Sequence, residues 1–255
     1  MNCKGLIILI FSVFGMNSQF MANEGHYEAL FEKANEVYKA GNYDSAKGLY
    51  SEIIQNGMVS SELFYNLGNT FYKKGNIPEA ILFFERAHRL SPNDEDIKYN
   101  LDIANTYITD KITPLENVFF TKWWESITYA FSVTTWSVLF ILLLFAAAAL
   151  FTLFGVSNNR KVKQLGLLGG GFVLGASIVV ILLTNSAFNK LNLNQAIVFS
   201  PTVNIKSEPG LNAMDQFVIH EGLKVEIIDT DGDWTRIRLS DGNSGWLQSQ
   251  SIEKI

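Results

Sequence analysis

Few residues in this 255-residue chain could do acid–base or nucleophilic chemistry. The three histidines, His26, His88 and His220, lie far apart in the sequence, and the single cysteine is Cys3. No motif for a Ser-His-Asp set, a phosphate-binding Walker loop or a zincin is visible. The sequence therefore predicts a protein that is not an enzyme and that needs no cofactor.

Three nearby acids, Asp229, Asp231 and Asp233, are the best candidates for a metal site. An EF-hand calcium loop needs further ligands, including a bidentate Glu at its twelfth position. Asp231-Gly232 is also a turn signal, so a hairpin turn explains these acids. A single cysteine can form neither an internal disulfide nor a cysteine metal cluster. We expect no metal site.

The charge of the chain bears on its partners. The formal net charge is −5 at pH 7, and neither polar part of the chain, before or after an apolar middle, is basic. Proteins that bind nucleic acid usually carry a basic patch. We therefore expect no nucleic-acid partner. The length suits one large domain or two small ones.

Two stretches that lie 34 residues apart share one pattern. GNYDSAKGLYSEI begins at Gly41, and GNIPEAILFFERA begins at Gly75. The same offset relates Tyr65-Asn66-Leu67 to Tyr99-Asn100-Leu101. A 34-residue period of helix, turn and helix is the signature of tetratricopeptide repeats.

Residues 61–94 resemble the tetratricopeptide repeat family closely. The matching residues are Phe64, Leu67, Gly68, Phe71, Ala80, Phe84, Ala87 and Pro92. Within residues 24–112, the resemblance implies repeats at 27–60 and 61–94, followed by a capping helix at 95–110. It also implies an all-α domain whose stacked repeats bind a peptide or a partner protein on a concave face.

By the same resemblance, the first helix of each repeat lines the binding groove. The groove residues that it implies are Asn35, Tyr38, Tyr65, Asn66, Asn69, Tyr72 and Lys73. Asparagine amides can donate to and accept from the backbone of an extended peptide, and tyrosines are common in binding hot spots. The alternative is that the tyrosines only pack between helices or face solvent.

Some members of this family clamp a C-terminal carboxylate with paired lysines and asparagines. In this sequence, Phe31 and Asp96 stand where the lysines would be expected. A C-terminal carboxylate is therefore not the expected ligand.

The middle of the chain holds two uncharged apolar segments, residues 136–156 and 165–184. Each has roughly the 20 residues that a helix needs to cross about 30 Å of hydrocarbon. Because backbone groups in lipid must satisfy their own hydrogen bonds, both segments are predicted to be transmembrane helices. The alternative is a buried helical hairpin in a soluble protein.

The connector at residues 157–164 sets the predicted orientation. It carries Arg160, Lys161 and Lys163 and no acid. Short basic loops stay in the cytoplasm, so the parts on either side of the hairpin face away from the cytoplasm. Since neither span contains an ionisable residue, transport and proton relay are not expected.

Two further segments bear on the membrane. Residues 1–22 have the pattern of a secretory signal, with Lys4 before an apolar core; an uncleaved signal anchor is the alternative. Residues 113–135 mix aromatic side chains with Lys122 and Glu125, which is typical of a helix at the membrane interface. The alternative for this aromatic linker is a loop packed under the repeats.

Residues 195–255 change to a two-residue period. Leu223–Ile227 and Trp234–Leu239 alternate apolar with polar residues, and Asp-Gly pairs mark turns. About 60 residues of short strands indicate a small all-β barrel. The order of features resembles bacterial SH3-like domains. These features are Val203–Pro209, His220–Gly222, Trp234 and Gly245–Leu247. The resemblance implies binding of cell-wall peptides or of proteins.

The predicted fold class is a multidomain membrane protein with an all-α tetratricopeptide repeat domain, a transmembrane helical hairpin and a small all-β SH3-like barrel. This order of parts resembles the BatE proteins of the Bacteroides aerotolerance operon. The resemblance implies a two-pass protein of the bacterial inner membrane, with the repeats and the barrel in the periplasm.

The same resemblance implies protein partners. They would be other Bat membrane proteins that carry von Willebrand factor A domains, with a MoxR-type ATPase on the cytoplasmic side. The implied function is that of a scaffold in a complex for aerotolerance, oxidative stress or envelope stress. The alternative is a protein that binds or senses peptidoglycan through its SH3-like domain.

Overall fold

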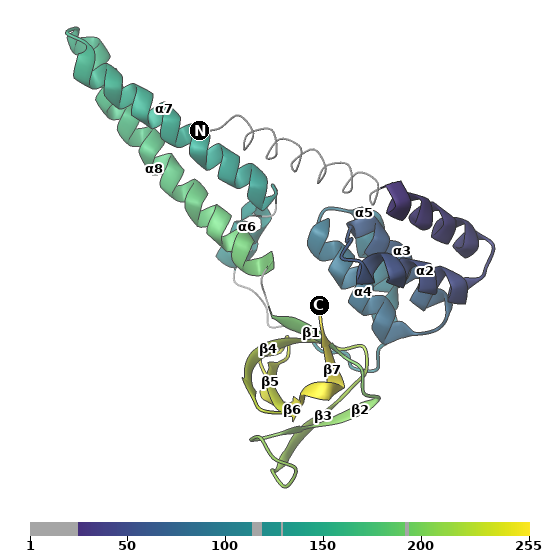
Figure 1. The fold of residues 1–255 in the computed structure, drawn as a ribbon. Helices are drawn as coiled ribbons and strands as arrows, with labels where there is room; N and C mark the ends of the chain where they lie inside the picture. The colour runs from purple at the N-terminus through teal and green to yellow at the C-terminus, as the bar shows by residue number, and fades with distance from the viewer. Residues whose placement is uncertain (1–24, 114–118, 129, 192–193) are drawn as a thin grey trace, which may run out of the picture. The chain divides into compact units, whose positions relative to one another are not determined.

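The computed structural model describes residues 25–113, 119–128, 130–191 and 194–255. The predicted signal segment at residues 1–22 lies outside the described residues. The chain forms two compact units, Met1–Thr113 with Asn194–Ile255, and Pro114–Leu193. The first unit holds the repeats and the barrel (Figure 1), and the second holds the apolar helices. Each unit is described by itself.

The repeat domain is a stack of short helices. Residues 25–39 are helical and are followed by α2 (Tyr43–Gln55), α3 (Ser61–Lys73), α4 (Ile77–Leu90) and α5 (Glu95–Thr106). Gly41 and Gly75 join the two helices of each repeat, and both have a φ of 81°. Only glycine adopts this left-handed conformation at little cost, so the 34-residue spacing of these two glycines reflects one turn used twice.

Small residues let the repeat helices approach closely. Ala46 and Ala80 are fully buried at equivalent positions. At Gly68, a Cβ atom would lie 2.7 Å from Cδ1 of Phe84, which is closer than packed carbon atoms approach. A larger side chain at Gly68 would therefore push α3 away from α4.

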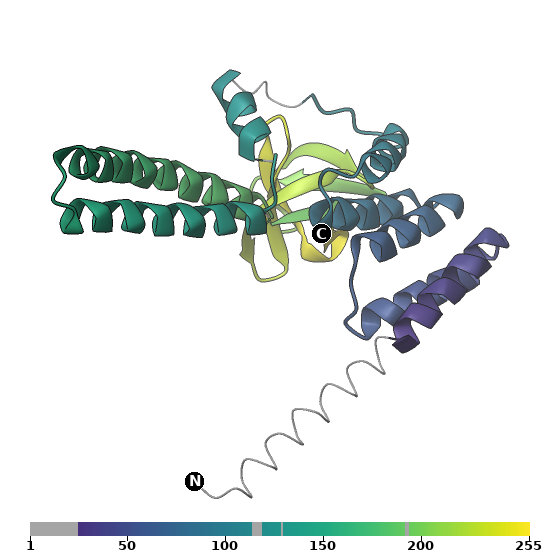
Figure 2. The same ribbon diagram turned by 90° about the horizontal axis from the view of Figure 1, so that it is seen from above.

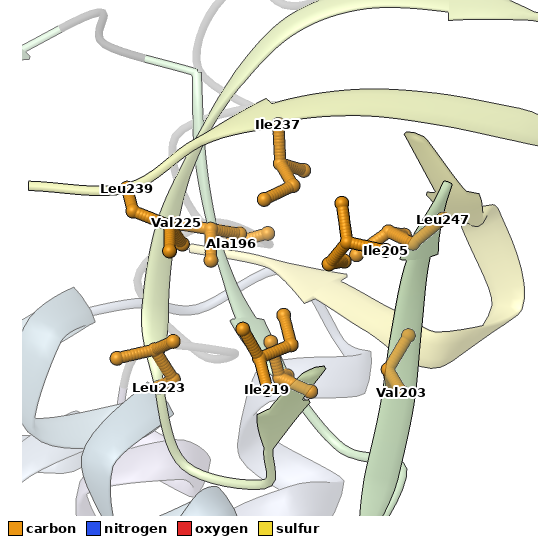
Figure 3. Close-up of a cluster of buried hydrophobic side chains, with 10 residues drawn as sticks. Ala196, Val203, Ile205, Ile219, Leu223, Val225, Ile237, Leu239 and Leu247 are labelled. Atoms are coloured by element: carbon orange, nitrogen blue, oxygen red, sulfur yellow. The ribbon is translucent and has the colours of Figure 1, made fainter. Parts of the chain in front are cut away.

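The barrel is one antiparallel sheet of seven strands in the order β3-β2-β6-β5-β4-β1-β7. The strands are β1 (Gln195–Val198), β2 (Thr202–Lys206), β3 (Asp215–His220), β4 (Lys224–Asp231), β5 (Trp234–Arg238), β6 (Ser244–Gln248) and β7 (Ile252–Lys254). Figure 3 shows aliphatic side chains from β1 to β6 pointing toward one another in its core. The two-residue period therefore reflects strands that bury one face.

The barrel packs against the repeats within the first unit. Residues 107–113, which follow α5, form no helix, so the third repeat has no second helix to cover it there. Ile197 of β1 is fully buried and shares a cluster with Ile81 of α4 and Leu101 of α5. Ile108 contacts both this cluster and the core of the barrel. The barrel thus covers apolar surface that a further repeat helix would otherwise cover.

The second unit contains α6 (Phe119–Thr128), α7 (Val133–Val156) and α8 (Arg160–Leu191). Helices α7 and α8 lie side by side as a hairpin in Figures 1 and 2. Both are long and apolar enough to cross a membrane.

The connector of the hairpin is shorter than the sequence predicts. Helix α8 begins at Arg160, so only residues 157–159 of the predicted loop at 157–164 are non-helical. The reason is local, because Asn159 Oδ1 accepts a hydrogen bond from the backbone N–H of Lys161 at 2.9 Å. Asparagine in this position stabilises a helix start, and the basic residues join the first turns of α8.

The glycines of α8 fall into two groups. A Cβ atom at Gly166 would lie 2.6 Å from the backbone oxygen of Leu150, and Gly170 lies against the ring of Phe151. These glycines allow α7 and α8 to pack closely. Around Gly171 and Gly175, a Cβ atom would meet nothing within 4 Å.

Helix α6 lies within the predicted aromatic linker at 113–135. Its Trp124 donates from Nε1 to Ser186 Oγ of α8 at 3.2 Å, and Trp136 of α7 donates to the backbone oxygen of Thr128 at 3.0 Å. Phe120 and Trp123 remain 77% and 56% exposed. The helix is therefore tied to α8 and still presents aromatic surface.

Candidate protein-interaction site

The first helices of the repeats carry equivalent side chains at the 34-residue offset. We call the surface that they form the first-helix face. Its residues are Glu28, Phe31, Asn35, Tyr38, Glu62, Tyr65, Asn66, Asn69, Tyr72, Lys73, Asp96, Tyr99 and Asn100. Most lie three or four residues apart on one helix, which places them on the same side of that helix.

Asparagines join neighbouring first helices. Asn66 Nδ2 donates to Asn35 Oδ1 at 3.0 Å, and Asn100 Nδ2 donates to Asn69 Oδ1 at 3.0 Å. The two bonds are related by the 34-residue offset. These amides therefore fix the spacing between repeats, and recognition of a peptide by Asn35 or Asn69 stays a prediction.

Aromatic residues on the face pack against aromatic rings of the second helices, and this contact also repeats at the 34-residue offset. The ring of Phe31 lies 5.9 Å from that of Tyr50, and the ring of Tyr65 lies 5.9 Å from that of Phe84. Tyr99 occupies the next equivalent position and is 67% exposed. Tyr99 is thus the exposed member of this column, since Phe31 and Tyr65 are partly buried.

Hydroxyl groups link the aromatic residues to the amides. The Tyr50 hydroxyl donates to Asn35 Oδ1 at 2.6 Å, and the Tyr65 hydroxyl accepts from Asn100 Nδ2 at 2.7 Å. Burial is the main cause that raises the pKa of Tyr50 to about 12. Smaller contributions to this raised pKa come from nearby Tyr38, Glu62 and Glu32.

The remaining predicted residues lie toward the ends of the first helices. Tyr38 is partly buried and packs against Tyr43 at 5.3 Å, and burial raises its pKa. Tyr72 donates to the hydroxyl of Tyr107 at 3.1 Å, which raises the pKa of Tyr72. Lys73 is exposed.

The sequence reasoning missed three residues of this network, Tyr50, Asn100 and Tyr107. A signal for Asn100 was present, because it lies 34 residues after Asn66. Tyr50 belongs to a second helix and reaches the face from beneath, through its ring against Phe31 and its hydroxyl on Asn35. Tyr107 follows α5, where the repeat pattern ends.

Polar contacts fix the barrel on the repeats. Glu85 of α4 has a side chain only 9% exposed, and its Oε1 lies 2.8 Å from Lys224 Nζ on β4. Arg86 donates to the backbone oxygen of Lys254 at 2.7 Å. Arg89 donates to the backbone oxygen of Ile255 at 3.0 Å. Helix α4 therefore contacts the barrel both through an ion pair and through hydrogen bonds from its arginines to backbone carbonyl oxygens of the barrel.

The segment after α5 is also held by the barrel. Asp110 Oδ2 accepts from the backbone N–H of His220 at 2.6 Å, and Asp110 Oδ1 lies 2.9 Å from His220 Nδ1. Ile108 packs against Gly222 in the following turn. The segment from Tyr107 to Asp110 thus connects the first-helix face with the barrel, since Tyr107 bonds to Tyr72 and Asp110 bonds to His220.

A second candidate surface lies on the outer face of the barrel. Trp246 of β6 is partly buried and pairs with Arg236 on β5 and with Lys206 on β2. Lys206 Nζ also lies 2.6 Å from Asp215 Oδ1. Trp246 and the exposed Arg236 therefore lie at neighbouring positions on one face of the sheet, which suits a ligand that has an apolar or sugar surface and an anionic group.

The three acids considered for calcium lie at a hairpin turn. Asp231 ends β4, Gly232 follows with a φ of 55°, and Asp229 Oδ1 accepts from the backbone N–H of Thr230 at 2.8 Å. Within the parts of the chain that the structure describes, no group of three or more His, Cys, Asp or Glu side chains could hold a metal ion.

Comparison with known families agrees with this architecture. Residues 61–94 match the tetratricopeptide repeat family, and residues 201–253 match the bacterial SH3 domain family. The predicted fold class is confirmed in these terms, with a helical repeat region, two apolar helices and an SH3-like barrel.

One relative is a bacterial protein that is named as a putative amidase. The chain is 30% identical over 82 residues to the putative N-acetylmuramoyl-L-alanine amidase YrvJ of Bacillus subtilis (strain 168). The matched segment covers 30% of this chain and spans 16% of that relative.

Proposed function

We propose that this protein is a membrane-anchored scaffold that binds partner proteins through its first-helix face. The observation that carries the proposal is a repeated arrangement in which exposed acids and neighbouring aromatics lie beside two bonded asparagine pairs. We call these pairs, Asn35 with Asn66 and Asn69 with Asn100, the asparagine ladder. Tetratricopeptide repeats are binding modules, and large tyrosine side chains bind partners at low entropic cost. No enzymatic activity is part of this proposal.

The apolar hairpin supports a place in the membrane. Helices α7 and α8 meet the length and composition of membrane spans. Arg160, Lys161 and Lys163 lie together at the turn between them. By the positive-inside rule, this turn faces the cytoplasm, and the repeats and barrel face the periplasm of a bacterial inner membrane.

The proposed partners follow from the resemblance to BatE proteins. We infer other Bat membrane proteins with von Willebrand factor A domains, in a complex for aerotolerance, oxidative stress or envelope stress. The order of repeats, apolar hairpin and SH3-like barrel supports this inference.

Co-purification from detergent-solubilised native membranes tests the scaffold. Replacing Tyr65 or Asn69 would break the ladder, so the better variant changes the exposed pair Lys73→Ala and Tyr99→Ala. We expect membrane-protein partners to co-purify with the wild type and to be lost from this variant. The matched control is Leu90→Ala with Lys98→Ala, which removes one cation and one exposed apolar side chain away from the face. If both variants keep the same partners, the first-helix face is not the docking site.

A second candidate function is peptidoglycan binding by the barrel. The bacterial SH3 match and the amidase relative favour it, as does the row formed by Lys206, Arg236 and Trp246. Peptidoglycan offers sugar rings and peptide carboxylates, which suit such a row.

Sedimentation of the full chain with purified peptidoglycan tests the second candidate. Binding should be lost with Arg236→Ala and Trp246→Ala. The control is Ile228→Ala with Arg238→Ala, which removes one exposed aliphatic residue and one cation elsewhere on the barrel. Equal sedimentation of the wild type and both variants would exclude this row as the binding surface.

A further inference from the structure

Resting on the scaffold function proposed above, we infer that the first-helix face binds a basic, extended segment of its partner protein. The chemistry of the face specifies Lys or Arg side chains at about every third residue of that segment. The inference depends on two columns of side chains and on the spacing between neighbouring first helices.

The first column is acidic. Glu28, Glu62 and Asp96 follow one another at the 34-residue offset, and all three side chains are exposed. Glu62 and Asp96 lie in the first turns of α3 and α5, and Glu28 holds the equivalent position on the helix at residues 25–39, so each repeat presents one carboxylate at the same place. A partner that matches this column must carry positive charge.

The second column is aromatic and lies one helical turn further along. Its members are Phe31, Tyr65 and Tyr99, each three residues after an acid. A cation above an aromatic face is attracted by the ring, more strongly where water is excluded. Acid and ring together therefore favour a Lys or Arg side chain over a neutral one.

The distance between repeats fixes the spacing of the cations. The 3.0 Å bonds of Asn66 to Asn35 and of Asn100 to Asn69 show that neighbouring first helices are in direct contact. Packed helices lie about 8–10 Å apart. An extended chain in the polyproline II conformation rises about 3.1 Å per residue with three residues per turn, so every third side chain lies on the same side and meets the next carboxylate.

Acids in a first turn have a simpler explanation, because they stabilise the positive end of the helix dipole. That explanation concerns folding stability and requires no partner. It gives no reason for the aromatic side chain three residues after each acid, which is partly buried at Phe31 and Tyr65 and 67% exposed at Tyr99. Stability and binding must therefore be measured on the same variants.

The test uses the full chain in detergent and fluorescence anisotropy of a labelled peptide, Gly-Ser-Arg repeated three times. Comparison peptides carry Glu in place of Arg, or the same residues with the three arginines adjacent. We expect the spaced arginine peptide to bind most tightly. Binding should weaken as NaCl is raised, because salt screens exposed charges.

The decisive variant is Glu28→Gln, Glu62→Gln and Asp96→Asn. It should weaken binding of the spaced arginine peptide about tenfold, the size expected for loss of three exposed ion pairs. The control Glu52→Gln, Glu79→Gln and Asp233→Asn removes the same charge away from the face and should stay within about twofold of the wild type. Circular dichroism and thermal unfolding check that both variants stay folded.

Equal weakening by the two variants, or equal binding of the Arg and Glu peptides, would overturn the inference. Co-purification separates it from the scaffold proposal. Suppose that the partner is lost from Lys73→Ala with Tyr99→Ala but kept by the decisive variant, in which the three acids of the face become amides. The face then binds partners, but not through its acids. If neither variant loses the partner, the scaffold proposal itself fails.

Discussion

The repeat domain is held together in two different ways at its two kinds of boundary. Between repeats, the same amide–amide bond occurs twice, from Asn66 to Asn35 and from Asn100 to Asn69. Against the barrel, the contacts do not repeat and combine a buried carboxylate, Glu85, with an apolar plug, Ile197. The comparison teaches that the array ends where a different domain supplies the missing packing.

The largest effect should come from the apolar plug. Ile197→Ala removes a fully buried side chain that packs on α4 and α5, which should cost about 2–5 kcal/mol. If the barrel completes the repeats, the helical signal at 222 nm and the tryptophan fluorescence of the barrel should shift together in urea. Ile237→Ala, within the barrel core, is the control. Helices that unfold at the wild-type urea concentration in Ile197→Ala would show that the two parts are independent.

The next effect concerns the ion pair at the same boundary. Lys224→Ala leaves the Glu85 carboxylate, 9% exposed, without its partner at 2.8 Å. We expect a loss of about 2 kcal/mol, below the range for a fully buried pair because Lys224 is 40% exposed. Urea unfolding measures the loss, and Glu85→Gln with Lys224→Met should restore part of it. A loss that the double variant does not reduce would contradict a specific pair.

The two kinds of boundary also differ in how well the sequence predicts them. The 34-residue period indicated the helices, the glycine turns and the equivalence of Asn35 with Asn69, because repeated packing requires repeated residues. The pairing of Glu85 with Lys224 joins residues 139 positions apart and has no periodic signal. A first-helix asparagine could therefore be placed from the sequence, whereas its hydrogen-bond partner and the barrel contact could not.

The two long apolar helices show the same limit. Uncharged runs indicated α7 and α8, since their length and composition alone carry the signal. The start of α8 at Arg160 depends on one side-chain bond from Asn159, which a charge count does not contain. Likewise, only the structure separates Gly166, packed on α7, from Gly171, which has open space around it.

A pH-dependent effect should appear within the repeats. The pKa of Tyr50 is raised to about 12 from about 10, so the folded state holds this proton more tightly than the unfolded state. The resulting stability is complete below about pH 10 and is lost as pH rises toward about 12, by roughly 2 kcal/mol. Urea unfolding at pH 9 and pH 11 measures it. In Tyr50→Phe, this part of the pH dependence should disappear; an unchanged slope would assign it to other groups.

The smallest effect tests whether the two rungs of the asparagine ladder are equivalent. Asn69→Ala removes one acceptor of Asn100 Nδ2, which keeps its bond to the Tyr65 hydroxyl, so we expect a loss of about 1 kcal/mol. A double-mutant cycle with Asn100→Ala gives the coupling energy of that rung. The same cycle on Asn35 and Asn66 gives the other. Similar couplings would show that each repeat contributes one interchangeable bond. A much larger coupling beside α5 would mean instead that the barrel stiffens the asparagine pair nearest to it, and that the boundary with the barrel acts on the face proposed to bind the partner.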